Sequence, residues 1–295
     1  MARLLGFPRL RAALRRVRPL VAFLDSLRAT PSLPAGLVLA AYRTLVWLVD
    51  ATRFSRRLSV AVGGLTRRIH VTLSLRGPAG ALLRVSLPVQ PQAWWTLYEV
   101  VFAQVYRPRS ALAPAVVVDA GANIGLSSVY LHALYPAARF VCVEADPRNL
   151  ALLERNLRQN GVAADVIPAA LAAASGTITF RMHRAASDYS STGRSCFPES
   201  EFSTVEVPAT TLAELLDARG VARVGLLKID VEGAEFDILG DTSAIARLDY
   251  VTGEFHGFAG DIDALAERVC RAARLVVLRR SGDASLATFH LGPPG

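Results

Sequence analysis

The sequence is poor in cysteine, in lysine and in uninterrupted apolar runs, and these shortages exclude several classes of protein. Three cysteines in 295 residues are too few and too scattered for a disulfide framework or a zinc cluster: Cys142, Cys196 and Cys270. We therefore expect a reducing, cytoplasmic location. The chain has no internal repeat. Its basic residues are not interleaved with aromatic ones, so we expect no nucleic-acid partner.

The longest apolar stretch, from Leu33 to Val49, does not predict a membrane-spanning helix. It contains Arg43 and is bounded by Pro34. A span needs about 20 apolar residues, and a central arginine is costly there. The stretch also begins too late for a secretory signal and lacks a cleavage site.

Positive charge is concentrated at the beginning of the chain, whose formal net charge is +8. The only acid before residue 29 is Asp25, against Arg3, Arg9, Arg11, Arg15, Arg16, Arg18 and Arg28. Apolar residues recur there at helical spacing: Leu10, Leu14, Val17, Val21 and Leu24. Two interpretations stay open. The segment is either a peripheral contact for anionic lipid or a partner, or a helix or arm that accompanies the folded domain.

The most informative stretch is a buried strand that runs into a glycine turn. The strand, Val116 to Val118, ends at Asp119, and Gly121 and Gly125 follow. Continuous apolar residues suit a strand covered on both faces, and glycines allow a sharp turn and close approach of a ligand. A helical pattern begins at Leu126. Strand, turn and helix together predict a nucleotide-type site at the carboxyl end of a parallel strand.

The position of the acid favours one nucleotide over another. Dinucleotide sites carry glycines spaced G-x-G-x-x-G and aim a helix N-terminus at a pyrophosphate. Here the spacing is G-x-x-x-G, and Asp119 precedes Gly121 by two positions. A carboxylate there would repel a pyrophosphate and pair with an ammonium group. The turn therefore favours S-adenosylmethionine over NAD, with Asp119, Gly121, Asn123 and Gly125 around its methionine end.

A second acid stands at the end of the next apolar run. Residues 140–143 form that run, and Glu144 follows it. In doubly wound sheets, an acid in this place accepts hydrogen bonds from ribose hydroxyls. We predict that role for Glu144.

A third segment, residues 224–235, holds the chain's only lysine and three crowded acids. Lys228 is that lysine, and every other basic residue of the chain apart from histidine is an arginine. A compact ammonium therefore has a role there that arginine does not fill, or its presence is chance. Asp230, Glu232 and Glu235 follow within a few residues. Such carboxylates perturb one another's pKa or share a cation.

These motifs together resemble one methyltransferase family. DAGANIGLSS, VEADP, LKIDVEGAE and the Glu254-Phe255-His256 run are similar, in order and spacing, to the FkbM family of S-adenosylmethionine-dependent methyltransferases. Asn123, at the middle glycine position of the broader methyltransferase turn, is typical of this group. The resemblance implies a Rossmann-like class I methyltransferase sheet with helices on both faces. It also implies O-methylation of a hydroxyl on a sugar or secondary metabolite.

Methyl transfer to a hydroxyl requires an aligned acceptor oxygen and a group that takes its proton. Asp230 should end the strand beside the cofactor strand, and His256 should end the next one. We predict that His256, whose ordinary pKa is near 6.5, is the base. Asp230 or Glu232 would orient the acceptor or hold a divalent cation. Alternatively, His256 is an ordinary hydrogen-bonded histidine and the carboxylates are structural.

Other readings of function remain. One is a non-catalytic S-adenosylmethionine-binding partner subunit, and a weaker one is an NAD enzyme. For organisation, we predict a basic, apolar helical extension over 1–57, a small β/helical lead-in over 58–113 and the methyltransferase domain over 114–295. Within these segments we expect strands near 58–75 and 81–87, a helix capped by Thr210 or Thr211, a helix over 262–273 and a terminal strand pair.

Overall fold

The computed structural model describes residues 29–51, 66, 68–183 and 199–294. The basic segment before residue 29 lies outside them, as does the polar run 187–195, which we interpret as a substrate loop or an ordinary surface loop. Both interpretations stay predictions. The chain divides into two compact units, residues 1–94 and 95–295. The boundaries predicted at 57/58 and 113/114 remain predictions.

The first unit pairs a two-stranded sheet with a helix. β1 (His70–Arg76) and β2 (Leu82–Pro88) are antiparallel. They bury alternate side chains, as the period of a half-buried strand requires: Leu73, Leu75, Leu83, Val85 and Leu87. α2 (Leu33–Ala51) packs on β1, and its Tyr42 hydroxyl donates to the Pro88 carbonyl at 2.9 Å. No helix in the described part of the chain combines the length and apolar content needed to cross a membrane.

The second unit contains a seven-stranded sheet in the order β11-β12-β10-β9-β3-β4-β5. Its strands are β3 (Val116–Ala120), β4 (Arg139–Val143), β5 (Ala164–Ile167), β9 (Leu226–Ile229), β10 (Val251–His256), β11 (Val276–Gly282) and β12 (Leu286–Gly292). β3, β4, β5, β9 and β10 are parallel, whereas β12 runs antiparallel to both of its neighbours. This confirms the predicted Rossmann-like sheet and the terminal strand pair.

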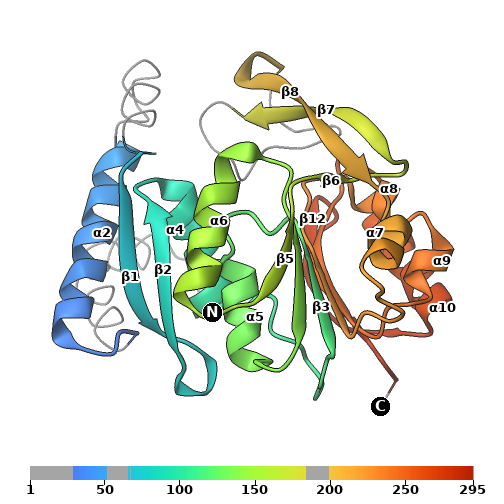
Figure 1. Ribbon diagram of the computed structural model, residues 1–295, viewed down its shortest axis with the longest axis horizontal. Coiled ribbons are helices and arrows are strands. Elements are labelled where there is room, and N and C mark those ends of the chain that lie inside the picture. The colour runs from blue at the N-terminus through green and yellow to red at the C-terminus, as the bar shows by residue number, and fades with distance from the viewer. Residues whose placement is uncertain (1–28, 52–65, 67, 184–198, 295) are drawn as a thin grey trace, which may run out of the picture. The chain divides into compact units, whose positions relative to one another are not determined.

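Helices cover both faces of this sheet. Figure 1 shows α5 (Leu126–Leu134) and α6 (Pro147–Gln159) on one side and α7 (Leu212–Ala218), α9 (Thr242–Ile245) and α10 (Ile262–Ala273) on the other. Helix starts follow capping chemistry. Thr211 Oγ1 accepts from the Glu214 N–H at 3.1 Å, which settles the predicted cap of α7. The helix predicted over 262–273 is α10.

The remaining elements are short or peripheral to the seven-stranded sheet. β6 (Ala170–Leu171), β7 (Gly176–His183) and β8 (Phe202–Thr210) form a separate three-stranded sheet. α4 (Pro91–Leu97) is continued by a π-helix over Tyr98–Phe102. Two 3-10 turns, Pro78–Gly80 and Glu199–Glu201, and α8 (Glu235–Ile238) complete the described elements.

Candidate functional site

Most of the predicted site residues gather at the carboxyl ends of four neighbouring strands. The chain order of the strands reverses between β3 and β9, since β4 and β5 extend the sheet one way and β9 and β10 the other. Ligands of open α/β sheets bind outside the carboxyl ends of the strands at such a switch point. The structure brings the glycine turn after β3, Glu144 after β4, Asp230 after β9 and His256 at the end of β10 to this edge.

The turn after β3 depends on its glycines for its backbone conformation and for a close contact with the neighbouring strand end. Gly121 and Gly125 have φ of 76° and 85°, and Asn123 between them has 50°. A Cβ on Gly121 would lie 1.9 Å from the carbonyl oxygen of Asp230. Gly121 therefore admits the backbone of the neighbouring strand end, which locks the turn to the residues after β9.

Asp119 is buried beneath this turn and is paired within the protein. Its side chain is fully buried, and its Oδ2 accepts from the hydroxyls of Ser127 and Ser128 at 2.5 and 2.6 Å. Its Oδ1 lies 3.2 Å from the ammonium of Lys228. This carboxylate therefore already holds an ammonium of its own chain, and its predicted pairing with a cofactor ammonium stays a prediction.

Lys228 connects that buried carboxylate to the glycine turn. Its Nζ donates to the Gly121 carbonyl at 2.7 Å and lies 5.3 Å from the centre of the Tyr106 ring. Burial alone would lower the pKa of Lys228, but Asp119, and then Asp230, outweigh it and raise that pKa. Three donors on a compact ammonium suit this confined place, whereas a planar guanidinium is larger and fixed in shape. The lone lysine therefore has a definite structural role.

Glu144 lies at the end of β4 with its carboxylate against the same turn. Oε2 accepts from the Asn123 N–H at 2.7 Å, and Oε1 accepts from the Asp146 N–H at 2.8 Å and the Asn149 amide at 3.2 Å. Burial raises the pKa of Glu144 to about 7, although these hydrogen bonds act in the opposite direction. A carboxylate has about four acceptor positions. These three contacts leave about one acceptor position of Glu144 for another donor.

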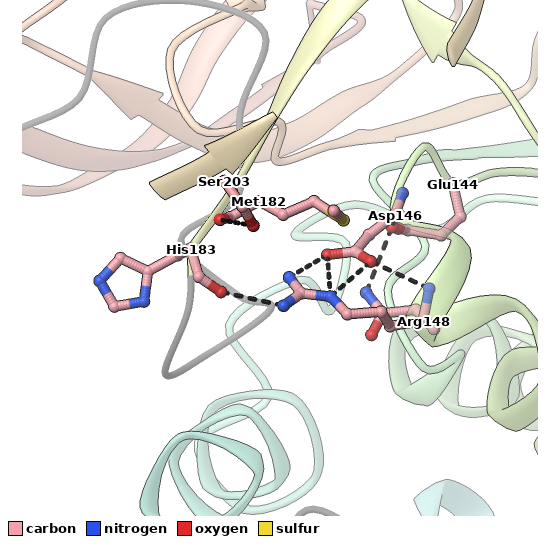
Figure 2. A network of polar contacts seen from close by, with 7 residues as sticks. Glu144, Asp146, Arg148, Met182, His183 and Ser203 are labelled. Atoms are coloured by element: carbon pink, nitrogen blue, oxygen red, sulfur yellow. Dashed lines mark hydrogen bonds and ion pairs between the residues drawn. The ribbon is translucent and has the colours of Figure 1, made fainter. Parts of the chain in front are cut away.

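Arg148 ties this strand end to the three-stranded sheet. Figure 2 shows its guanidinium on the Asp146 carboxylate, with Nε 2.8 Å from Oδ1, while Nη1 donates to the His183 carbonyl at 3.0 Å. Asp146 also caps α6 by accepting from the Arg148 N–H at 3.0 Å. The end of β7 is therefore anchored beside Glu144.

Asp230 faces a partner that the motifs did not reveal. The hydroxyl of Tyr106 donates to Asp230 Oδ2 at 2.9 Å. Burial, followed by the charge of Asp230, raises the pKa of Tyr106 well above its usual value. Asp230 Oδ1 is buried and has no hydrogen-bond partner among the described residues.

His256 is held between two carboxylates. Its Nδ1 lies 3.0 Å from Glu235 Oε1, and its Nε2 lies 3.5 Å from Glu232 Oε2. Burial would lower the pKa of His256, but the hydrogen bond and charge of Glu235, with Glu232 and Asp230, raise it to about 10. The pKa thus lies above the ordinary value of about 6.5 for histidine, and the role of His256 as the base stays a prediction. The neighbouring carboxylates therefore stabilise the protonated form of this imidazole.

The acids around His256 repel one another. Burial and the charge of Asp230 raise the pKa of Glu254 to about 8 and that of Glu232 well above its usual range. Glu232 also has a φ of 54°, which is uncommon for a residue with a side chain. One ligand atom from each of Asp230, Glu232 and His256 lies within 4.8 Å of the others, a spacing that suits a metal ion.

Sequence patterns missed two residues of this site and one contact of a third. Tyr106 lies in a stretch without a motif, and Arg148 looks like an ordinary first-turn residue of a helix. Glu235 was visible as part of the acidic run, but its bond to His256 joins residues 21 positions apart. Only the pairing of β9 with β10 brings them together.

Comparison with known proteins decides the family. A model of the FkbM methyltransferase domain matches residues 119–275, which is more than half of the chain. The chain belongs to the FkbM methyltransferase family. This match starts at Asp119 and includes the glycine turn, Glu144, Asp230 and His256.

Curated relatives of this FkbM protein are similar over part of their length. Methyltransferase sdnD of Sordaria araneosa is 30% identical over 42% of this chain and 58% of that protein. Methyltransferase 1 of Beauveria bassiana is 30% identical over 42% of this chain and 56% of its own length. The AMB antimetabolite synthetase AmbE of Pseudomonas aeruginosa is 28% identical over 62% of this chain, but the chain spans only 11% of it.

Among solved structures, a crystal structure of methyltransferase FkbM from Methylobacillus flagellatus KT is similar to 95% of this chain. The chain covers 60% of that structure, with 15% identity and a TM-score of 0.43. At that level of similarity, the assignment of the fold rests on the strand order described above.

Proposed function

We propose that this protein is a methyltransferase that uses S-adenosylmethionine as the methyl donor and methylates a hydroxyl oxygen of a sugar or secondary metabolite. The observation that carries the proposal is the place of Glu144, a buried carboxylate beside a glycine turn at the switch point of the sheet. A ribose diol needs such an acceptor at the end of the second strand of the fold.

The residues present fit this donor in chemistry. Glu144 keeps acceptor capacity for a ribose hydroxyl, and the turn from Gly121 to Gly125 presents backbone rather than bulky side chains. Asp119 supports the turn through Lys228, whose ammonium donates to the Gly121 carbonyl. When bound, S-adenosylmethionine supplies an electrophilic methyl group on a sulfonium.

The geometry disfavours an NAD enzyme. A pyrophosphate binds where a helix N-terminus and free N–H groups face it without a nearby carboxylate. Here the Asn123 N–H is taken by Glu144 at 2.7 Å, and Asp119 binds the first-turn hydroxyls of α5. Two carboxylates next to the helix N-terminus oppose a phosphate and tolerate a cationic ligand.

The acceptor would be handled by the residues at the ends of β9 and β10. The chain must align the acceptor oxygen and take its proton. Asp230 lies on the strand beside β3, and Glu232 and His256 lie next to it. Because the charges of Glu235, Glu232 and Asp230 all act on the pKa of His256, the carboxylates and the imidazole would accept the proton as one coupled group.

A direct test incubates the full chain with S-adenosylmethionine carrying a deuterated methyl group and with a panel of hydroxylated acceptors. We expect S-adenosylhomocysteine and a product that has gained the labelled methyl group, both detected by mass. Binding of S-adenosylhomocysteine without turnover on any acceptor would favour the non-catalytic partner subunit instead.

A further inference from the structure

The group formed by Asp230, Glu232 and His256 has the composition and spacing of a metal site. It offers two carboxylate oxygens and one imidazole nitrogen, all within 4.8 Å of one another. The two acids follow β9 and the histidine ends β10, which are paired parallel strands. Rigid strand ends therefore hold all three side chains at one point of the sheet edge.

The histidine is oriented in the way that metal-binding histidines usually are. The Nδ1 of His256 lies 3.0 Å from Oε1 of Glu235, whose side chain is fully buried. That same oxygen accepts from the N–H groups of Val231 at 3.1 Å and Gly233 at 3.2 Å, which fixes the carboxylate. A carboxylate behind Nδ1 sets the tautomer and leaves Nε2 as the ligand atom. Nε2 is the nitrogen that faces Glu232, at 3.5 Å.

One carboxylate oxygen of the cluster has no internal hydrogen-bond partner among the described residues. Asp230 Oδ1 is buried without a partner in the described part of the chain, and a buried carboxylate oxygen left in this state is costly. Glu232 adopts a φ of 54°, directed to this place against its conformational preference. Non-glycine residues in this region of φ occur at functional sites, where the surrounding structure holds them.

We propose that Asp230, Glu232 and His256 bind a divalent cation, with Glu235 as the positioning residue behind His256. Mixed carboxylate and imidazole donors suit Mn²⁺ better than Mg²⁺, which prefers oxygen ligands and retains its water. Three protein ligands leave coordination positions open to solvent or to an acceptor.

If the proposed methyl transfer is correct, this cation holds the acceptor. Coordination of a hydroxyl to the cation lowers the pKa of that hydroxyl, so that its proton passes more readily to the coupled acceptor groups of the site or to water. The oxygen then forms the new bond to the methyl carbon, while the sulfur–methyl bond breaks and its electron pair stays on sulfur as a neutral thioether. Open positions on one cation favour acceptors with two adjacent oxygens, such as the vicinal hydroxyls of a sugar.

The test measures Mn²⁺ binding itself, without an acceptor. The full chain is stripped with a chelator and titrated with Mn²⁺, and free Mn²⁺ is followed by electron paramagnetic resonance. We expect the parent to bind, and Asp230→Asn, Glu232→Gln and His256→Gln to weaken binding by at least about tenfold, because losing an orienting partner alone costs about 10–100-fold. Glu235→Gln, which removes the orienting partner, should weaken Mn²⁺ binding by about 10–100-fold.

The matched control is Glu267→Gln, a carboxylate 71% exposed in a surface pair with Arg271, which should leave Mn²⁺ binding unchanged. Circular dichroism confirms that each variant is folded. No Mn²⁺ binding by the folded parent, or equal binding by the control and all four cluster variants, would overturn the metal site. A parallel titration with S-adenosylhomocysteine tests the methyl donor separately, since its result does not depend on the cation.

Discussion

The ammonium of Lys228 lies 3.2 Å from Asp119 Oδ1, and both side chains are buried beneath the glycine turn. The same ammonium donates to the Gly121 carbonyl at 2.7 Å. One internal ion pair therefore connects the glycine turn after β3 to the neighbouring strand β9.

Replacing this lysine should destabilise the fold strongly. Lys228→Met leaves Asp119 as an uncompensated buried charge, which costs about 3–5 kcal/mol of unfolding free energy. Urea denaturation followed by circular dichroism measures the change. Arg271→Ala breaks an exposed pair, 72% and 71% exposed, and serves as the control. It should cost less than about 1 kcal/mol, and equal losses in the two variants would contradict the role given to Lys228.

The glycine turn offers a second matched pair of substitutions. Gly121 has a φ of 76° and Gly161 a φ of 67°, but a Cβ would meet the Asp230 carbonyl at 1.9 Å only at Gly121. Both alanine variants carry left-handed strain of about 1–2 kcal/mol. Gly121→Ala should lose about 1–3 kcal/mol more through overpacking. Thermal unfolding of the two variants measures this difference in stability. Equal losses of stability in the two variants would contradict the close contact between the turn and the residue after β9.

The sequence predicted the parts of this protein that depend on local pattern. Apolar runs located β3, β4, β9 and β10, and the acids and glycines located the edge where their carboxyl ends meet. The bond from Glu235 to His256 and the contact of Tyr106 with Asp230 were not predictable. They join residues far apart in the chain, so they follow only from strand order and register.

Electrostatic behaviour was the least predictable property of the site. The sequence shows His256 with an ordinary pKa, and the fold raises that pKa to about 10 because buried carboxylates surround the ring. Asp119 shows the same limit. Its position after a strand suggested a ligand contact, but its register places it opposite Lys228 on β9.

Cofactor affinity should depend on pH through Glu144. Burial raises its pKa from 4.5 to about 7, and only the ionised carboxylate offers all of its acceptor positions to ribose hydroxyls. Affinity for S-adenosylhomocysteine should therefore be highest above about pH 7 and should fall below it, approaching about tenfold per pH unit, the limit for one coupled proton. Calorimetry across this range measures the profile.

Glu144→Gln is the control for that profile, because an amide does not titrate. Its affinity should be weaker and independent of pH in this window. The contribution of Glu144 to the free energy of unfolding depends on pH in the opposite direction. A carboxyl whose pKa is raised on folding contributes most below its unfolded pKa of 4.5, and that contribution is lost as pH rises through about 7. A parent whose cofactor affinity shows the same pH profile as Glu144→Gln would exclude Glu144 as the titrating group.

Removing His256 should affect chemistry and not cofactor binding. With an acceptor identified, the single-turnover rate of His256→Ala at saturating cofactor should fall by about 10²–10⁴-fold, the range for loss of a proton-transfer group. Affinity for S-adenosylhomocysteine should stay at the parent value, since the ring contacts Glu235 and Glu232 and not the glycine turn. An unchanged rate would remove His256 from the chemistry.

The central claim, that this FkbM methyltransferase binds S-adenosylmethionine at the switch point of its sheet, is tested most directly by isothermal calorimetry with S-adenosylhomocysteine. We predict saturable binding by the parent chain at a single class of sites. Glu144→Ala should weaken it at least about tenfold, because a lost charge-assisted hydrogen bond costs about 1.5–3 kcal/mol. Absence of binding by the folded parent, or equal affinity in the parent and Glu144→Ala, would contradict the claim.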